Sequence, residues 1–163
     1  MEIDRRAFIA LGGAGLVGAA LAARSGPGEA AAGEKFEISL GEAQWKRRLT
    51  AAEFRVLRKG GTERAGSSPL DREKRRGTYV CAGCKLPLFS SQAKYDSGTG
   101  WPSFRAPLDN AVGTRPDDSL FMKRTEVHCR RCGGHLGHVF DDGPPPTGKR
   151  YCMNGVALDF VPA

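Results

Sequence analysis

Cysteine spacing is the feature of this 163-residue chain that most restricts its chemistry. Four of the five cysteines form two C-x-x-C pairs, and the fifth stands apart from them. The pairs are Cys81 with Cys84 and Cys129 with Cys132, and the fifth residue is Cys152. A thiol without a partner in such a pattern is either inert packing or a nucleophile, and its neighbours indicate which.

The residues around Cys152 favour a nucleophile. Arg150 lies two positions before it, and a nearby cation lowers the pKa of a thiol. Asn154 is an amide two positions after it, and His135 and His138 lie upstream. This combination of side chains resembles the surroundings of a thiolate.

The two C-x-x-C pairs predict a metal site. Each pair follows a β-like segment, so each is expected to form a knuckle, and two knuckles supply a tetrahedral site for one structural Zn²⁺ per chain. The stretch between Cys84 and Cys129 is longer than the roughly 15–20 residues of a zinc ribbon, so the knuckles are expected to be joined across a larger sheet. Two disulfides are the alternative in an oxidising compartment. Zinc is preferred because two matched knuckles would otherwise be a coincidence.

Length and charge limit the classes of protein. The length predicts one domain plus an extension. The acidic and basic residues of positions 1–33 balance, so the net charge of +7 falls on residues 34–163. A basic surface attracts nucleic acid, anionic lipid or acidic protein. No long Lys/Arg run or interleaved aromatic series is present, so the charge is interpreted as serving solubility, and no nucleic-acid partner is expected.

Residues 1–32 predict an export signal and a tether. Asp4-Arg5-Arg6-Ala7-Phe8-Ile9 opens the chain, an uncharged stretch runs from Ala7 to Ala23, and small residues follow. This pattern resembles a twin-arginine signal. Its glycines make it less hydrophobic than a membrane span of about 20 apolar residues. The expected location is periplasmic, without a stable membrane span after signal cleavage, and an uncleaved anchor is the alternative.

The elements expected after the tether are mostly β-strands. Trp45 and Leu49 predict a short helix over Glu42–Leu49, and the capping box Thr50-Ala51-Ala52-Glu53 opens a second one. Both helices are expected to cover another part of the domain. Residues 60–77 are polar and predict a long loop. The β-like segments are 78–80, 125–128, 135–140 and 151–160. The fold class is therefore a small, mostly antiparallel β domain.

Four motifs now make a resemblance specific. They are Gly60-Gly61-Thr62-Glu63-Arg64, Tyr95-Asp96-Ser97-Gly98-Thr99-Gly100-Trp101-Pro102-Ser103-Phe104, His135-Leu136-Gly137-His138-Val139-Phe140 and Arg150-Tyr151-Cys152-Met153-Asn154. With them the sequence resembles the B-type methionine-R-sulfoxide reductases from Glu34 to Pro162. The resemblance implies a mostly β fold of two small antiparallel sheets with short N-terminal helices, often with a structural zinc. It implies a reductase domain over residues 33–163 that acts on free or protein-bound methionine R-sulfoxide.

The resemblance also implies a chemical role for Cys152. Its thiolate would attack the sulfoxide sulfur, and the departure of methionine would leave a cysteine sulfenic acid. Arg150 would lower the pKa of the thiol, and His138 would donate a proton to the sulfoxide oxygen.

Three further residues receive roles from the resemblance. Trp101 would hold the substrate methyl group against its ring, and His135 and Asn154 would orient substrate and water. Each also has a structural interpretation, because Trp101 fits a core, a histidine fits a strand and Asn154 before a glycine fits a turn. Arg64 and Asp96 fall in the motifs and are expected to be structural.

Many members of the family carry a second cysteine two residues before the tryptophan, and this chain has Thr99 there. No intramolecular resolving cysteine is therefore expected. An external thiol, such as that of a thioredoxin-like protein, would reduce the Cys152 sulfenic acid.

Two other functions remain open. An exported zinc-knuckle binding module without catalysis explains the charge and the metal but leaves Cys152 and the two histidines unexplained. A disulfide oxidoreductase needs a helix after its first cysteine, whereas Pro87 closely follows Cys84. Replacing Cys152 with Ser distinguishes the reductase from a binding module. The reductase would lose its activity while keeping its fold and zinc, whereas the function of a binding module would not change.

Overall fold

The computed structural model describes residues 35–119 and 123–163. These residues belong to one compact unit, Glu34–Ala163. The export signal expected in residues 1–32 lies outside the described residues. In the described part of the chain, neither α-helix is long and apolar enough to cross a membrane.

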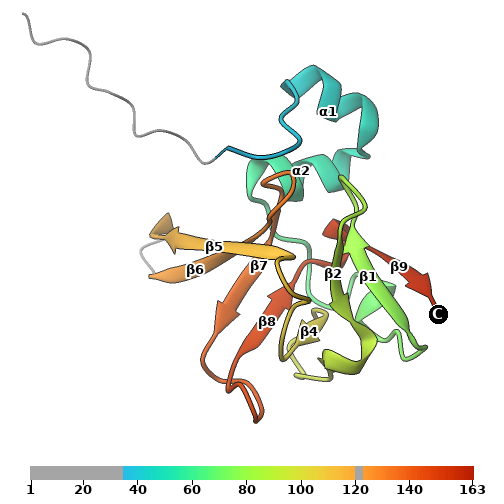
Figure 1. Ribbon diagram of the computed structural model, residues 1–163, viewed down its shortest axis with the longest axis vertical. Helices are drawn as coiled ribbons and strands as arrows, with labels where there is room; N and C mark the ends of the chain where they lie inside the picture. The colour runs from blue at the N-terminus through green and yellow to red at the C-terminus, as the bar shows by residue number, and fades with distance from the viewer. Residues whose placement is uncertain (1–34, 120–122) are drawn as a thin grey trace, which may run out of the picture. The chain divides into compact units, whose positions relative to one another are not determined.

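Two antiparallel sheets form the body of the domain (Figure 1). The three-stranded sheet has the order β2-β1-β9, with β1 at Gly77–Cys81, β2 at Pro87–Ser90 and β9 at Leu158–Pro162. The six-stranded sheet has the order β3-β4-β8-β7-β6-β5. Its strands are β3 at Lys94–Tyr95, β4 at Ser103–Phe104, β5 at Val112–Asp117, β6 at Arg124–Cys129, β7 at His135–Phe140 and β8 at Arg150–Met153. The expected fold class is confirmed.

The aromatic core lies between the two sheets. Tyr79 of β1 and Phe104 of β4 meet edge to face with ring centroids 4.9 Å apart. Phe89 of β2 stacks on Phe104 at 4.3 Å. All three side chains are fully buried. Because each large aromatic ring removes much apolar surface from water, this contact is a main reason that the sheets stay together.

The expected helices are present. Helix α1 spans Glu42–Arg48 and α2 spans Ala51–Lys59. The predicted capping box is formed, since the Thr50 hydroxyl accepts from the Glu53 N–H at 3.3 Å and the Glu53 carboxylate accepts from the Thr50 N–H at 2.7 Å. Helix α2 ends at Gly60, whose φ of 65° is left-handed. The expected loop over residues 60–77 contains one short 3₁₀ helix, η1, at Pro69–Asp71.

One expectation about the strands is wrong. The segment 151–160 is not a single β element, because β8 and β9 belong to different sheets and the 3₁₀ helix η4 at Gly155–Ala157 separates them. The Asn154 N–H donates to the Leu136 carbonyl at 2.8 Å, which holds the end of β8 on β7 while the chain turns toward the other sheet.

The sequence also gave no signal for β2 to β5. Strands β3 and β4 have only two residues each, which is too short for an alternating pattern. Strand β5 contains Pro116 and exposed polar residues, which it tolerates because it lies at the edge of the six-stranded sheet. A further 3₁₀ helix, η2 at Ser91–Ala93, connects β2 to β3.

Candidate active site and metal centre

Cys152 lies on β8, in the interior of the six-stranded sheet. Its two cross-strand partners are Ser103 of β4 and His138 of β7. Directly opposite residues of an antiparallel pair have neighbouring side chains, so the register brings the thiol and the imidazole to one place. Figure 1 shows β7 and β8 running side by side through the middle of the domain.

A cavity of about 160 Å³ opens at this place. Four of the six residues predicted for catalysis line it: Trp101, His138, Cys152 and Asn154. Its other lining residues are Thr62, Arg124, Gly137, Phe140 and Met153. The two remaining predicted residues, His135 and Arg150, do not line this cavity.

Asp117 holds His138, and Arg124 in turn holds Asp117. His138 Nε2 is 2.7 Å from Asp117 Oδ2, and the same oxygen accepts from Arg124 Nη2 at 2.8 Å. Burial lowers the pKa of His138, and the hydrogen bond to Asp117 opposes that effect. Hydrogen bonds from Ser119 and His138 hold the pKa of the Asp117 carboxyl well below its usual range. The histidine is therefore neutral at rest and faces a carboxylate that would stabilise its protonated form.

His135 makes a separate pair. Its Nδ1 is 2.7 Å from Glu126 Oε1, and its ring centroid lies 5.4 Å from that of His138. Burial alone would raise the pKa of Glu126, but His135 and Arg115 lower it to about 2. His135 and His138 both line a neighbouring hollow of about 490 Å³, so His135 stands behind His138 rather than beside the thiol.

Asn154 and Trp101 are fixed by a loop that is distant in sequence. The Asn154 side chain accepts from the Glu63 N–H at 2.9 Å and donates to the Leu136 carbonyl at 3.0 Å. Trp101 Nε1 donates to the Glu63 carbonyl at 3.2 Å. Both groups of the Asn154 amide thus have main-chain partners, and the indole ring has a fixed orientation at the cavity wall.

Glu63 is a residue of this site to which the sequence assigned no role. Its carboxylate accepts from the N–H groups of Gly155 and Val156, just after Cys152 and Asn154 in the chain. Burial raises the pKa of the Glu63 carboxyl, and these two N–H groups oppose that effect. Glu63 therefore fastens its loop to the segment that follows the thiol.

The Cys152 thiol has competing electrostatic surroundings. Burial raises its pKa, whereas Thr99 and Arg150 act to lower it. Arg150 donates two hydrogen bonds of 2.8 Å to Asp142, and its guanidinium lies 4.4 Å from the Phe140 ring centroid. Arg150 acts in the expected direction, but the pKa of the thiol is raised because burial outweighs it.

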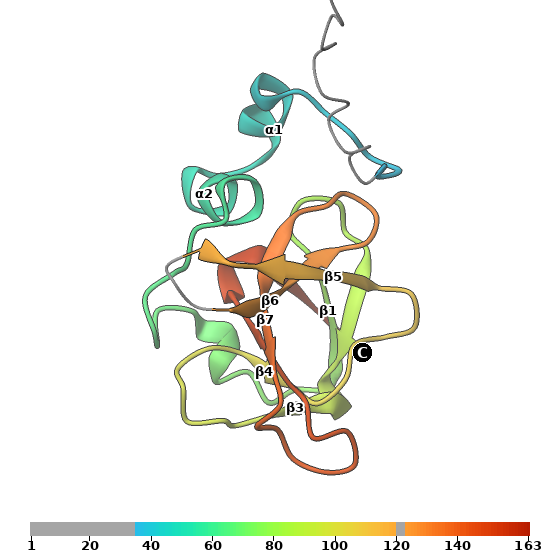
Figure 2. The same cartoon turned by 90° about the vertical axis from the view of Figure 1, so that its left-hand side faces the viewer.

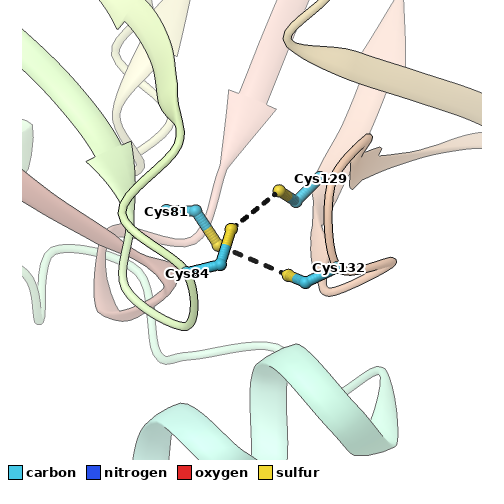
Figure 3. A group of neighbouring side chains, drawn as sticks. All are labelled: Cys81, Cys84, Cys129 and Cys132. Atoms are coloured by element: carbon cyan, nitrogen blue, oxygen red, sulfur yellow. Dashed lines mark hydrogen bonds between the residues drawn. The ribbon is translucent and has the colours of Figure 1, made fainter. Parts of the chain in front are cut away.

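The four paired cysteines meet at one point, as Figure 3 shows. Their sulfur atoms all lie within 4.8 Å of one another, and the members are Cys81, Cys84, Cys129 and Cys132. The sulfur atoms of Cys81 and Cys132 are 3.8 Å apart, and those of Cys84 and Cys129 are 3.5 Å apart. Tetrahedral zinc with Zn–S bonds of about 2.3 Å requires sulfurs roughly 3.8 Å apart. A disulfide requires about 2.05 Å. The set fits a tetrahedral metal site and not two disulfides.

Both knuckles have the expected turn geometry. The Lys85 N–H donates to the Cys81 carbonyl at 2.8 Å, and the Gly133 N–H donates to the Cys129 carbonyl at 2.8 Å. Cys81 ends β1 of the three-stranded sheet, and Cys129 ends β6 of the six-stranded sheet. The site therefore joins the two sheets, which explains the long stretch of chain between the pairs.

The helices cover these knuckles. Arg58 of α2 donates to the Cys132 carbonyl at 2.9 Å. A Cβ placed on Gly83 would lie 3.5 Å from Trp45 of α1 and 3.6 Å from Leu57 of α2, so both side chains pack against the first knuckle. Figure 2 shows α1 and α2 together at one end of the domain. The expectation that the helices form a cover is met.

The structure explains why some site residues were missed. Asp117 and Arg124 reach His138 through the pairing of β5 with β6, where they are opposite each other. Neither belongs to one of the sequence motifs. Asp96, expected to be structural, accepts from the Gly98 N–H at 2.9 Å and so closes the turn before Thr99.

The fold and the cavity define a small two-sheet protein with a thiol–histidine site. The chain matches the SelR domain family over residues 49–162. The peptide methionine sulfoxide reductase MsrB of Leptospira interrogans is 51% identical over 126 residues, which cover 77% of this chain and 96% of that relative. The MsrB of Pseudomonas putida is 54% identical over 130 residues, covering 79% of this chain and 96% of that relative.

The chain therefore belongs to the MsrB family of peptide methionine sulfoxide reductases. Among solved structures, the crystal structure of the Mis18 "Yippee-like" domain has a TM-score of 0.45 and 17% identity, and it covers 55% of this chain and 98% of that chain. A likeness this slight carries no argument.

Proposed function

We propose that this protein reduces methionine R-sulfoxide, free or protein-bound, to methionine by attack of Cys152 on the sulfoxide sulfur. Family membership makes the protein an oxidoreductase, a peptide-methionine (R)-S-oxide reductase. The observation that carries the mechanism is that Cys152, His138 and Trp101 line one cavity.

The chemistry follows from the surroundings of the thiol. Because burial raises the pKa of Cys152, the thiol is protonated at rest, and it must first give its proton to the neutral His138 imidazole that lines the same cavity, which thereby becomes the imidazolium. The thiolate sulfur then forms a bond to the sulfoxide sulfur while the sulfoxide oxygen takes a proton from the His138 imidazolium. The hydroxyl group then moves from the methionine sulfur to the Cys152 sulfur as the bond between the two sulfurs breaks, so methionine departs and Cys152 becomes a sulfenic acid. The methionine sulfur is reduced by two electrons, and the Cys152 sulfur is oxidised by two.

Trp101 provides the apolar wall against which the substrate methyl group packs. Its hydrogen bond to the Glu63 carbonyl fixes the plane of the indole, and a sulfide methyl group packs well on an aromatic ring. A wall for the methyl group, a donor for the oxygen and a nucleophile for the sulfur define one handed arrangement. This arrangement supports selectivity for one sulfoxide epimer.

Two measurements test this function. Assays with the separated epimers should show that the R epimer is consumed and the S epimer is not. Cys152→Ser should abolish the activity, because a hydroxyl is a far weaker nucleophile than a thiolate. Its circular dichroism and zinc content should match those of the unchanged chain. Equal rates on both epimers, or full activity of Cys152→Ser, would contradict this proposal.

The sulfenic acid is reduced by an external thiol in this scheme. Thr99 stands beside Cys152, with its Oγ1 3.9 Å from the sulfur, and offers no second thiol there. The other four cysteines are grouped with one another. One equivalent of substrate followed by a sulfenic-acid trap should label Cys152, with the metal retained. A disulfide between Cys152 and any of the four knuckle cysteines, together with metal release, would overturn this recycling scheme.

Zinc is the metal we assign to the four-cysteine site, where its role is structural. Four thiolates at tetrahedral spacing suit Zn²⁺, and four protein ligands leave the metal no open position. Metal analysis of the purified protein should find about one zinc per chain. The absence of zinc would contradict this assignment.

The proposed location is periplasmic, by the twin-arginine route. Support comes from Arg5 and Arg6, followed by Phe8 and Ile9 and a weakly hydrophobic stretch. A route that carries folded proteins suits a chain that loads zinc before it meets an oxidising compartment. Changing both arginines to Lys should keep the protein in the cytoplasmic fraction. Continued export of that variant would exclude the route.

A further inference from the structure

A chain of hydroxyl groups leads away from the Cys152 sulfur. Thr99 Oγ1 lies 3.9 Å from that sulfur and 2.8 Å from Ser97 Oγ. Ser97 Oγ lies 2.7 Å from Ser103 Oγ, and the Ser103 hydroxyl donates to the Trp101 carbonyl at 3.1 Å. Ser103 is fully buried and is the cross-strand partner of Cys152. The mechanism above uses none of these three hydroxyls.

Counting protons fixes the direction of every hydrogen bond in this chain. A hydroxyl has one proton to donate. Since Ser103 gives its proton to the Trp101 carbonyl, Ser97 must donate to Ser103 and Thr99 must donate to Ser97. The proton of the Cys152 thiol then points to Thr99. All four protons are used while the thiol is protonated.

Loss of the thiol proton reverses the chain. The anionic sulfur needs a donor, and Thr99 supplies one only if its proton turns away from Ser97. Ser97 is then free to accept from Ser103, and the Trp101 carbonyl loses its donor. Three hydroxyl rotations accomplish this change, and no proton moves between heavy atoms.

We infer that Thr99 stabilises the Cys152 thiolate by turning its hydroxyl proton toward the sulfur, and that Ser97 competes for that proton while the thiol is protonated. Thr99 and Ser103 both face the reacting sulfur, whereas Ser97 is a positioning residue that acts through their hydroxyls. The inference rests on the proposed role of Cys152 as nucleophile. Thr99 is first among the groups that lower the pKa of Cys152 against burial, and Arg150 is already paired with Asp142.

Other groups around the thiol stay constant in the test. The charged and titratable neighbours of Cys152 are Arg150 on its own strand, His138 on β7, Arg124 on β6, and Tyr95 on β3. Asp142 pairs with Arg150 from the loop after β7. Variants at positions 97 and 99 change none of these groups.

The experiment measures the pKa of Cys152 in the zinc-loaded protein without substrate. The rate of its alkylation by iodoacetamide is followed against pH, with mass mapping to separate it from the knuckle cysteines. Thr99→Val should raise the pKa of Cys152 by about one unit, because a hydrogen bond to a charged group is lost. Ser97→Ala should lower it by roughly half a unit, because ionisation then breaks no hydroxyl contact.

Two controls separate the hydroxyl from the shape of the side chain. Thr99→Ser keeps the hydroxyl and should leave the pKa of Cys152 unchanged. Thr78→Val removes a hydroxyl from β1, in the other sheet, and should also leave it unchanged. If Thr99→Val fails to fold, Thr99→Ala replaces it in the test. This variant removes the same hydroxyl with a smaller side chain and should also raise the pKa of Cys152.

A purely structural role of Thr99 and Ser97 would not shift the pKa of Cys152 upward in Thr99→Val and downward in Ser97→Ala. The inference is overturned if Thr99→Val leaves the pKa of Cys152 unchanged, if Thr99→Ser shifts it as much as Thr99→Val, or if Ser97→Ala shifts it upward. The measurement uses no sulfoxide, so its result does not depend on the proposed function. Failure of the proposed function would instead be seen as no sulfoxide reduction by the unchanged chain.

Discussion

His138 is hydrogen-bonded to Asp117, which in turn binds Arg124, and these two opposite charges set how the proposed proton donor responds to pH. Asp117 accepts a hydrogen bond from the imidazole and favours its protonated form. Arg124, bonded to the same carboxylate oxygen, favours the neutral form. Burial lowers the pKa of His138 further, so activity that needs the imidazolium should fall as pH rises.

Replacing Asp117 with Asn should move this fall in activity to lower pH by roughly one unit. The sign follows because Asp117 raises the pKa of His138, so its loss makes the imidazolium disappear at a lower pH. Arg124→Gln should move the fall to higher pH, because Arg124 lowers that pKa. The measurement is kcat/KM for the R-sulfoxide between about pH 5 and 9. Shifts in the same direction for both variants would contradict the role of His138.

Among single residues, the sequence predicted those site residues that lie in its recognisable motifs. Cys152, His138, Trp101 and Asn154 were expected in one site, and they line one cavity. Glu63 joins the site through hydrogen bonds to residues 92 and 93 positions away. No local pattern reports a contact of that separation, because it exists only after the sheets have assembled.

Strands β7 and β8 approach each other closely at Gly137, and this approach positions the thiol. A Cβ on Gly137 would lie 2.1 Å from the Cys152 carbonyl oxygen, which is main chain and has no room to move aside. Glycine is therefore required here for packing rather than for a left-handed backbone.

Gly137→Ala should lower both stability and activity, since β8 must shift away from β7 to admit the methyl group. Overpacking of this kind costs about 1–3 kcal/mol. Gly41→Ala is the matched control, because a Cβ there makes only one ordinary contact, 3.6 Å from Gln44, far from both sites. Thermal unfolding and the rate on the R-sulfoxide should both separate the two variants. Equal values for both would show that β7 and β8 can adjust.

The elements differ in how far local sequence determines them. The capping box of α2 is a local signal, and it predicted the start of the helix correctly. The break between β8 and β9 is not local. Gly155 lies against Ser68, where a Cβ would come within 2.0 Å of the Ser68 hydroxyl oxygen, so a distant loop determines where the chain turns. The two-residue strands β3 and β4 pair with each other, and β4 also pairs with β8, so their extended conformation depends on strands that are distant in sequence.

In the whole domain, the metal site is the link between the two sheets at the end that the helices cover. One knuckle extends from β1 and the other from β6, so four metal–sulfur bonds would join strands of the two different sheets. The second knuckle leads directly into β7, which carries His138. The metal site and the catalytic cavity thus share one strand.

Removal of the proposed zinc should therefore destabilise the domain as a unit. Four thiolates left together without a metal repel one another or must take up protons, and the covering helices lose the surface against which they pack. The melting temperature should fall by about 10 °C or more after treatment with a chelator. Activity should fall with it, because β7 loses its support at the second knuckle.

The Cys152→Ser variant is the control for this measurement, because its thiol does not belong to the four-cysteine group. This variant should bind the same amount of zinc as the unchanged chain, and its melting temperature should fall by the same amount on chelation. It is inactive before and after chelation. Zinc content by metal analysis and unfolding by circular dichroism report the two quantities separately. An unchanged melting temperature in fully metal-free protein would mean that the aromatic contact of Tyr79, Phe89 and Phe104 alone holds the sheets together. In that case the four-cysteine site would have to be explained by a role other than stability.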